Sequence, residues 1–549
     1  MRRIQAVLAA FVTAGSLAAQ PAYDVVLRGG NVFDGGGKPA VTADVAIRGD
    51  SVVAVGSLPS VRARLELDVR GFAVAPGFID IHTHARHGVF RDPNAANYIR
   101  QGVATLIEGN DGDSPLPLRP FLDRLSRTPI AVNYGTFAGH GTVRQSVLAL
   151  ENRKATSAEI QKMKSLVEQA MRDGAFGLST GLFYVPGSYS PTEEVIELAR
   201  AAGRLGGIYI SHIRDEAAGI LASVRETIRI GEKARLPIQI THHKIVGRRN
   251  WGKSVETLRL VVEARARGID VTLDQYPYTA SSTGTTALFP QWSLEGGFEA
   301  LARRLQDPAQ RAKIKAEVMD RILYDRGGGD PRNIVMADCP FDPSLNGRNL
   351  AEIAGEPPTV ERAAETLIDL QTRGGCAAIY HALDERDVER ILRFPFTMIA
   401  SDGEIHAFGE GAPHPRSYGT FARVLGRYVR ERRLLSLEEA IRKMTSLPAS
   451  RLSLKDRGLL HPGMKADIVV FDPATIADRA TFQQPHQYAS GVKHVFVNGK
   501  PVILDGRTTG ERPGRVLYGP GRALAERFLK DGEALRHGRP GRLLALHLE

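Results

Sequence analysis

The sequence predicts an α/β protein, a (β/α)8 TIM-like barrel with a small β-sandwich built from both chain ends and an inserted cap segment. Three observations predict this arrangement. Apolar, strand-like runs alternate with helical stretches through the middle of the 549-residue chain. Valine-rich alternating segments stand before and after this middle part, and the alternation breaks between residues 288 and 350.

The start of the chain has the pattern of a secretory signal. Met1-Arg2-Arg3 is followed by an apolar run that ends in small residues at Ala19, which is the order of a signal peptide. The run is shorter than the roughly 20 apolar residues of a membrane-spanning helix. For residues 1–20 we therefore expect cleavage near Ala19 or Gln20, export to the periplasm or the medium, and no stable membrane anchor.

Residues 21–73 and 455–515 are expected to form the small β-sandwich. Tyr23 to Phe72 alternates apolar and polar residues and is interrupted by glycine clusters, a pattern typical of short antiparallel strands with glycine turns. Similar strand-like segments, rich in valine, occur in residues 466–472 and 492–499. Both chain ends are thus predicted to join in one β domain.

Residues 74–454 are expected to form the barrel domain. Thr192 to Leu205 and Ala217 to Ala234 have helical periodicity and separate strand-like runs, as repeated βα units require. Ala377 to His381 also has strand character, so this segment or a neighbour must lie outside the barrel. The eight candidate strands are Phe78 to Ile81, Ala104 to Glu108, Ile130 to Tyr134, Phe176 to Ser179, Ile208 to His212, Ile238 to His242, Ile269 to Asp274 and Thr397 to Ser401.

Residues 288–350 are predicted to be an insertion. The stretch contains a helical pattern from Phe298 to Leu323, three consecutive glycines and an apolar run at Ile334 to Met336. This is too long for a loop between a strand and a helix of the barrel. We expect it at the strand ends, where it would cap the site.

Composition limits the class of protein. Apolar residues make up 43% and charged residues 24% of the chain, which is typical of a globular protein. The net charge of +11 favours encounters with anions, but no base-reading module is visible, so no nucleic-acid partner is predicted.

Residues 516–549 are expected to be a solvated basic tail with some helix from Ala523 to Leu535. Cys339 and Cys376 could form one disulfide in an oxidising compartment, but the sequence does not place them together, and we expect free, buried thiols. The oligomeric state stays undetermined.

The most informative stretch is Pro76 to His84, which reads Pro-Gly-Phe-Ile-Asp-Ile-His-Thr-His. Its apolar residues suit a buried strand, and His82 and His84 follow at its end. Side chains two apart on a strand share a face. At the carboxyl end of the first barrel strand both imidazoles would point into the mouth, where barrel enzymes build their active sites.

Three further candidate strands end in residues able to bind a metal ion. His212 and His242 each close a strand, and Asp402 follows a third. We prefer His242 to the adjacent His243, because strand alternation points His243 the other way. Together with His82 and His84 these residues form a nitrogen and oxygen set suited to zinc.

Asp402 has a second possible task besides binding metal. A hydrolytic metal ion polarises a carbonyl and lowers the pKa of a bound water towards about 7. A nearby carboxylate can take the proton of that water and return it to the leaving nitrogen. The alternative is that Asp402 only caps the turn with Gly403.

Taken in order, the motifs between about Asp24 and Arg515 resemble the amidohydrolase superfamily, and within it the D-aminoacylase (N-acyl-D-amino-acid deacylase) branch. The superfamily resemblance rests on Pro76 to His84, the strand-end histidines, Ser401-Asp402-Gly403 and Gly463 to Phe471. Marks of the branch are Gly139 to Arg144, Gly177 to Leu182, His212 to Glu216, His242 to Lys244, Asp274 to Tyr278 and His414 to Arg416.

The resemblance implies an exported metal enzyme that hydrolyses the amide bond of small-molecule N-acyl-D-amino acids. It implies zinc at His212 and His242, a second, weaker position at His82 and His84, and Asp402 as general acid and base. One or two ions would be bound. Substrate-binding residues, which would hold the carboxylate or orient the carbonyl, are implied to be Lys244, Tyr276, Ser282 and Arg416.

One residue departs from the pattern of the best-known members. They carry Gly-Asn-Cys-Gly after the second strand, with the cysteine on zinc, whereas this chain reads Gly109-Asn110-Asp111-Gly112. Asp111 is the expected metal ligand, with Glu108 as a second candidate. An oxygen ligand is harder than a thiolate, so manganese or a similar ion stays open beside zinc.

Other functions are less well supported by the sequence. Gly177-Leu178-Ser179-Thr180-Gly181 matches the nucleophile elbow of serine hydrolases, but Leu182 to Gly187 is a poor helix start. A cyclic-amide hydrolase of the dihydroorotase or hydantoinase kind commonly uses a carboxylated lysine, and the fourth candidate strand contains none. The remaining alternative is a non-catalytic metal-binding periplasmic protein.

Overall fold

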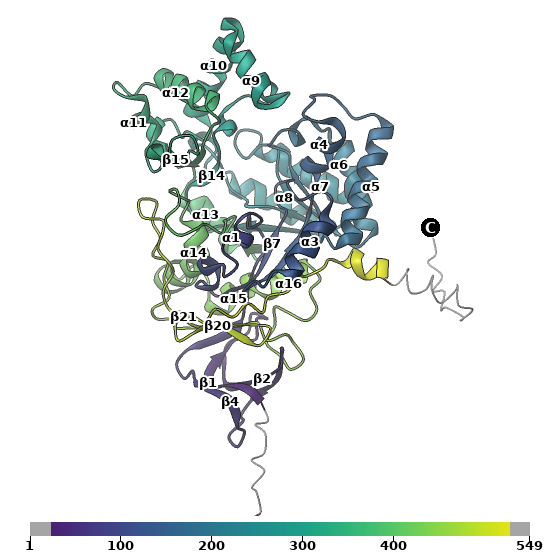
Figure 1. The fold of residues 1–549 in the computed structure, drawn as a ribbon, viewed down its shortest axis with the longest axis vertical. Helices are drawn as coiled ribbons and strands as arrows, with labels where there is room; N and C mark the ends of the chain where they lie inside the picture. The colour runs from purple at the N-terminus through teal and green to yellow at the C-terminus, as the bar shows by residue number, and fades with distance from the viewer. Residues whose placement is uncertain (1–22, 527–549) are drawn as a thin grey trace, which may run out of the picture.

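The computed structural model describes residues 23–526. The predicted signal segment and most of the predicted tail therefore lie outside the described residues. Figure 1 shows three parts, with the barrel in the middle, a small β domain at the bottom and the inserted subdomain at the top. Within residues 23–526 no helix is both long enough and apolar enough to span a membrane.

The eight predicted barrel strands are present, one of them divided into β8 and β9, which confirms the predicted fold class. Parallel pairing runs from β6 to β8 and from β9 to β17, and Phe137 N–H donates to the carbonyl of Glu108 at the junction. The ring closes where Asp402 N–H donates to His82 O at 2.9 Å and His84 N–H donates to Gly403 O at 2.7 Å. The strands are β6 (Phe78–Asp80), β7 (Val103–Glu108), β8 (Asn133–Thr136), β9 (Ala138–Gly139), β10 (Gly177–Gly181), β11 (Ile208–His212), β12 (Ile238–Ile240), β13 (Val271–Gln275) and β17 (Thr397–Ile399).

Helices cover the outside of the barrel and hold its strands in place. The start of α5 is fixed by a capping box, in which Thr156 accepts from Glu159 N–H and Glu159 accepts from Thr156 N–H. Buried apolar faces of these helices pack on the strands in two apolar cores. The covering helices include α3 (Leu118–Arg127), α4 (His140–Leu148), α5 (Ser157–Asp173), α6 (Thr192–Arg204), α7 (Ile220–Ala234), α8 (Ser254–Ala266), α13 (Glu385–Arg393), α14 (Arg416–Arg423) and α15 (Leu437–Met444).

The small β domain is a nine-stranded mixed sheet drawn from both chain ends. We expected antiparallel strands, but β1 pairs with β4 and β5 in parallel. The reason is a bend at Gly29 and Gly30, where the register shifts and Gly29 has φ of +66°, so that the two halves of β1 meet different partners. The strands are β1 (Tyr23–Val32), β2 (Val41–Arg48), β3 (Ser51–Gly56), β4 (Ala63–Asp68), β5 (Ala73–Pro76), β18 (Ile468–Phe471), β19 (Val492–Val497), β20 (Lys500–Leu504) and β21 (Arg507–Thr508).

The insertion is longer than residues 288–350 and has a sheet of its own. This sheet has the order β14-β16-β15, so the strand-like segment at residues 377–381 belongs to the insertion and not to the barrel. Leu288, Ile314 and Leu367 belong to its separate apolar core. Its elements are β14 (Ser281–Gly284), α9 (Gly297–Gln306), α10 (Pro308–Tyr324), β15 (Ile334–Asp338), α11 (Leu350–Ala354), α12 (Val360–Thr372) and β16 (Ala377–Tyr380).

The structure corrects two expectations. Cys339 and Cys376 form a disulfide and are not free thiols, because the insertion places the end of β15 beside the start of β16. The chain also does not leave the protein at residue 516. Leu517 N–H donates to Tyr134 O at 2.7 Å and Gly519 N–H donates to Gly174 O at 2.8 Å, so this segment packs along the barrel.

Candidate metal centre and catalytic cavity

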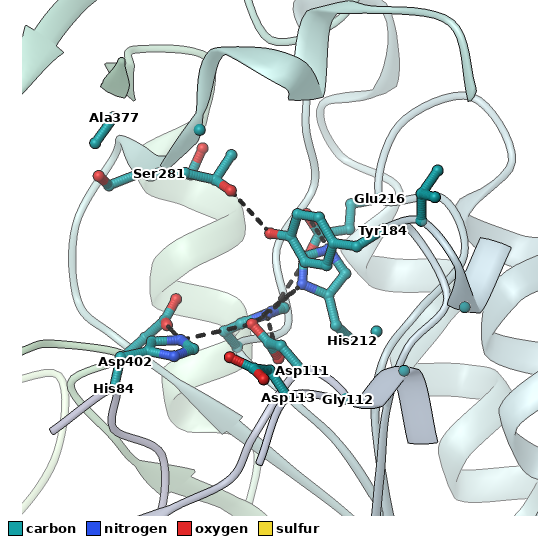
Figure 2. Close-up of a pocket in the computed structure, with 18 of the residues that line it drawn as sticks. His84, Asp111, Gly112, Asp113, Tyr184, His212, Glu216, Ser281, Ala377 and Asp402 are labelled. Carbon is teal, nitrogen blue, oxygen red and sulfur yellow. Dashed lines mark hydrogen bonds and ion pairs between the residues drawn. The ribbon is translucent and has the colours of Figure 1, made fainter. Parts of the chain in front are cut away.

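A cavity of about 410 Å³ opens at the carboxyl ends of the barrel strands. Its floor is formed by side chains that follow β6, β7, β11, β12 and β17, and its roof by β14 and β16 of the insertion. In Figure 2 His84 and Asp402 lie on one side of Asp111, and His212 and Glu216 lie on the other. This is the place where barrel enzymes carry out their chemistry.

His82 and His84 project from the end of β6, as their spacing predicts. His82 is fully buried, with Nε2 at 3.4 Å from Asp402 Oδ1 and 3.6 Å from Asp111 Oδ1. Its Nδ1 lies 3.4 Å from Asp274 Oδ1. The His84 side chain keeps 35% of its surface exposed, and its Nε2 lies 3.0 Å from Asp402 Oδ1.

Asp111 stands between the two pairs of histidines. Its oxygens lie 3.4 Å from His212 Nδ1 and 3.4 Å from His242 Nε2. The residue adopts the left-handed conformation, with φ of +55°, which aspartate tolerates better than most residues. Ser179 holds this loop, because its hydroxyl accepts from Gly112 N–H at 3.1 Å and donates to Gly109 O. Ser179 therefore supports the loop, and within residues 23–526 its hydroxyl makes no hydrogen bond to a histidine that could activate it as a nucleophile.

His212 and His242 face each other across the floor of the cavity, with Nδ1 and Nε2 2.8 Å apart. His242 N–H donates to Asp274 Oδ1 at 2.7 Å, so the carboxylate of β13 fixes the backbone of this ligand. Burial lowers the pKa of His212 to about 4. A neutral imidazole is the form that binds a metal ion.

The residues present fit a divalent metal ion. Two overlapping groups have ligand atoms within 4.8 Å of one another, one of His82, His84, Asp111 and Asp402, and one of Asp111, His212 and His242. Some of the possible ligand atoms are buried and make no hydrogen bond within the described residues. They are both ring nitrogens of His82, the Nε2 atom of His212 and the Oδ1 atom of Asp111. Unpaired buried polar atoms are costly, and imidazole with carboxylate is a donor set that zinc accepts.

Asp402 completes the first group and faces the cavity. Its Oδ1 lies 3.0 Å from His84 Nε2, and its Oδ2 accepts a hydrogen bond from Arg416 Nη1 at 2.7 Å. Burial alone would raise the pKa of Asp402, but Arg416, His82 and His84 hold it well below its usual range. Asp402 therefore stays ionised and able to accept a proton.

The four predicted substrate-binding residues all line the same cavity. The cations of Lys244 and Arg416 lie 5.5 Å and 4.9 Å from the centre of the Tyr276 ring. The Tyr276 hydroxyl is buried and has no hydrogen-bond partner within residues 23–526. Ser282 contributes its carbonyl to Arg416 at 3.4 Å. Next to it the buried Ser281 hydroxyl, which we did not predict, lacks a partner in the described chain.

Two further charged residues of the cavity were missed by the sequence analysis. Glu216 is 3% exposed and accepts from Lys244 Nζ at 2.5 Å and from Arg326 Nη2 at 3.1 Å. Glu216 lies within the motif that begins at His212, and its place in that motif was the available signal. Arg326 lies in the insertion, where no pattern in the sequence distinguished it from other arginines.

Two alternative ligands lie outside the metal-binding groups. The Glu108 side chain accepts from Thr136 Oγ1 at 3.2 Å, and burial raises its pKa to about 7 although Arg86 opposes this. His243 Nε2 contacts Thr257 Oγ1 at 2.8 Å, on the side of the strand away from the cavity. The preferences for Asp111 and His242 agree with these placements.

Comparisons with known proteins agree with this geometry. A family model described as "Amidohydrolase family" matches residues 66–503. D-aminoacylase of Alcaligenes xylosoxydans xylosoxydans is 41% identical over 518 residues, which cover 90% of this chain and 97% of that protein.

Two solved structures are similar over nearly the whole fold. A crystal structure of D-aminoacylase has a TM-score of 0.78 and 39% identity, and covers 90% of this chain and 100% of that chain. N-acyl-D-glutamate deacylase of Bordetella bronchiseptica, complexed with zinc and a phosphonate that mimics the tetrahedral intermediate, has a TM-score of 0.77 and 34% identity. That match covers 90% of this chain and 100% of the other.

Proposed function

This chain belongs to the amidohydrolase family, in its D-aminoacylase branch, and from that premise we propose that it is a zinc-dependent deacylase of N-acyl-D-amino acids. The products are a carboxylate and a free D-amino acid. The observation that carries the proposal is the floor of the cavity, where Asp111 joins two histidine pairs beside an ionised Asp402.

The residues of the cavity floor would bind the metal or support its ligands. His82, His84, Asp111, His212 and His242 would hold one or two zinc ions, with Asp111 shared between the two groups. When bound, zinc supplies a Lewis acid and a water whose pKa falls towards about 7. The buried carboxylate of Asp274 holds the backbone of His242 in place, which is the usual task of an outer carboxylate at a metal site.

Asp402 moves the proton. Its Oδ1 faces the ligand histidines, so it can accept a proton from the attacking water and pass it to the leaving nitrogen of the amide. Because Arg416 holds Oδ2, the carboxylate keeps one orientation during both transfers. The charge of Arg416 also favours the ionised form before each turnover.

Lys244, Tyr276, Ser282 and Arg416 would bind the carboxylate of the substrate or orient its carbonyl. Lys244 and Arg416 both lie near the Tyr276 ring. The buried Tyr276 hydroxyl has no hydrogen-bond partner within the described residues, so it can donate to the substrate. A guanidinium fork and a compact ammonium are both suited to a carboxylate. The insertion closes this side of the cavity through β14.

The two alternatives have less support. Strand β10 reads Gly-Leu-Ser-Thr-Gly and offers no lysine for carboxylation, while Asp111 already occupies the shared position between the metal-binding groups. A non-catalytic metal-binding role does not explain the ionised Asp402 beside them. The relatives that match over 90% or 91% of this chain are D-aminoacylase, N-acyl-D-aspartate deacylase and N-acyl-D-glutamate deacylase.

The decisive experiment is a substrate panel. Purified protein loaded with zinc is given N-acetyl-D- and N-acetyl-L-amino acids with aliphatic, acidic and basic side chains, and release of free amino acid is measured. We expect release from D substrates only. Intact zinc binding without release of any D-amino acid would refute the proposal.

We further propose that the protein is exported. The signal pattern of residues 1–20 supports this, and the Cys339–Cys376 disulfide suits an oxidising compartment. Mass spectrometry of the protein purified from the periplasm or medium of its host tests the proposal, and an intact Met1 in the cytosol would contradict it.

A further inference from the structure

Arg326 brings a buried charge from the inserted subdomain to the wall of the catalytic cavity. It follows α10 and is 3% exposed, and its guanidinium lies 4.5 Å over the ring of Phe183. Nη2 donates to Glu216, whereas Nε is buried and unpaired among the described residues. Gly327 keeps this turn tight, because a Cβ there would lie 2.3 Å from the carbonyl of Ile322.

Glu216 is shared between two cations. One of its oxygens accepts from Lys244 Nζ and the other accepts from Arg326, and all three side chains are almost fully buried. Two other carboxylates face these cations, and each has a cation of its own: Asp325 beside Arg326 pairs with Arg321 at 4.0 Å, and Asp402 pairs with Arg416 at 2.7 Å. The trio of Lys244, Glu216 and Arg326 therefore carries one positive charge in excess of its own carboxylate.

A buried charge without a counter-charge is unfavourable. An anion that enters the cavity would relieve it, and Lys244 lines the cavity at the point where the substrate carboxylate is proposed to bind. His242 Nδ1 lies 2.7 Å from Lys244 Nζ and 3.2 Å from Glu216 Oε1, and donation of Nδ1–H to Glu216 would leave Nε2 of His242 free for a metal ion. The excess charge thus lies beside the reacting centre.

We propose that Arg326 is a positioning residue for recognition of the substrate carboxylate. Because Arg326 donates to one oxygen of Glu216, the single negative charge of Glu216 is shared and does not fully neutralise Lys244. The remaining positive charge of Lys244 is then available to the substrate carboxylate. Without Arg326, Glu216 would neutralise Lys244 by itself. The inserted subdomain is then required for affinity as well as for covering the site. This inference rests on the proposed function, since it assigns the carboxylate to Lys244.

The test compares Arg326→Met with Arg326→Lys in zinc-loaded, full-length protein. Calorimetric titration uses isocaproate, a carboxylate without an amide to hydrolyse. We expect Arg326→Met to bind it about tenfold more weakly and Arg326→Lys to recover most of the affinity. With N-acetyl-D-leucine, KM should rise about tenfold in Arg326→Met while kcat changes less than about twofold.

A double variant separates a charge effect from a structural one. Adding Glu216→Gln to Arg326→Met removes the carboxylate that would neutralise Lys244, so isocaproate binding should return towards the wild-type value. Arg332→Met is the matched control, because Arg332 lies in the same subdomain but its side chain is 72% exposed and, within residues 23–526, forms an ion pair with Asp330 alone. It should bind isocaproate as the wild type does.

The outcomes distinguish this inference from the proposed function. Equal isocaproate affinity of Arg326→Met and wild type, with both proteins folded by their melting curves, would overturn it, as would a wild type that does not bind isocaproate. No rescue in the double variant would also count against it. Binding of isocaproate by the wild type without deacylation of any D substrate would refute the proposed function and leave the role of Arg326 standing.

Discussion

At the scale of single residues, Asp402 meets His84 with one carboxylate oxygen and Arg416 with the other. Asp402→Asn keeps the size of the side chain but removes the proton acceptor. We expect kcat to fall by about 10³-fold, within the range for loss of a general base. Zinc content, measured by elemental analysis, should stay close to that of the wild type. Substantial activity in this variant would refute the role of Asp402.

Asp111 is the residue on which metal identity should depend. Asp111→Ala removes the oxygen shared by both groups, so we expect loss of most bound metal. Asp111→Cys offers a softer ligand and should raise the preference for zinc over manganese, although cysteine accepts the left-handed backbone at this position less readily. Metal content after dialysis against equimolar zinc and manganese measures both effects. Unchanged metal content in Asp111→Ala would exclude Asp111 as a ligand.

Much of the candidate site could be predicted because strand ends are visible in the sequence. His82, His212 and His242 each follow a short apolar run that suits a buried strand, and parallel strands bring such ends together. Arg326 could not be predicted in this way. Its contact with Glu216 depends on how a long insertion folds back over the barrel, and no local pattern encodes that path.

At the scale of elements, the insertion is held together by its own sheet and by one disulfide. The Cys339–Cys376 bond closes a segment of 37 residues between β15 and β16, and chain-entropy estimates give such a closure about 3–4 kcal/mol. Replacing both cysteines by alanine should therefore lower the melting temperature. Differential scanning calorimetry, with dithiothreitol-treated wild type for comparison, measures this. An unchanged melting temperature would show that the bond adds no stability.

Every predicted barrel strand overlaps an observed one, with ends that differ by up to three residues, whereas the predicted insertion was too short. Barrel strands alternate with amphipathic helices, and this alternation identifies the strands in the parts of the sequence where it is regular. Ala377–Tyr380 has the same apolar character as a barrel strand, and only its antiparallel pairing with β14 and β15 removes it from the barrel. Pairing between distant segments is not encoded in the local pattern.

At the scale of the whole molecule, His494 predicts how stability responds to acid. It is 1% exposed in β19 and accepts from Asp505 N–H at 3.2 Å. Burial lowers its pKa to about 4, although Asp505 opposes this and Lys493 adds to it. Between pH 6.5 and 4 the unfolded chain binds a proton that the folded protein does not, so the free energy of unfolding falls as pH falls.

The variant His494→Asn keeps an acceptor for Asp505 N–H but cannot be protonated. Relative to this variant, the wild type should lose up to about 3 kcal/mol of stability between pH 6.5 and 4, and the two should respond alike above pH 7. Urea unfolding at several pH values measures the difference. Parallel curves for the two proteins over the acid range would contradict the prediction.

The joining of both chain ends in one sheet has a consequence for biosynthesis. Strand β5 lies between β1 and β18, which the chain reaches only at Ile468–Phe471. The barrel also receives backbone contacts from residues 517–519, near the end of the part of the chain that the structure describes. A chain emerging from the ribosome would therefore expose an unpaired strand edge until synthesis is nearly finished. We expect folding to begin late and to require protection of that edge, so that molecules that end before Ile468, and therefore lack β18, aggregate.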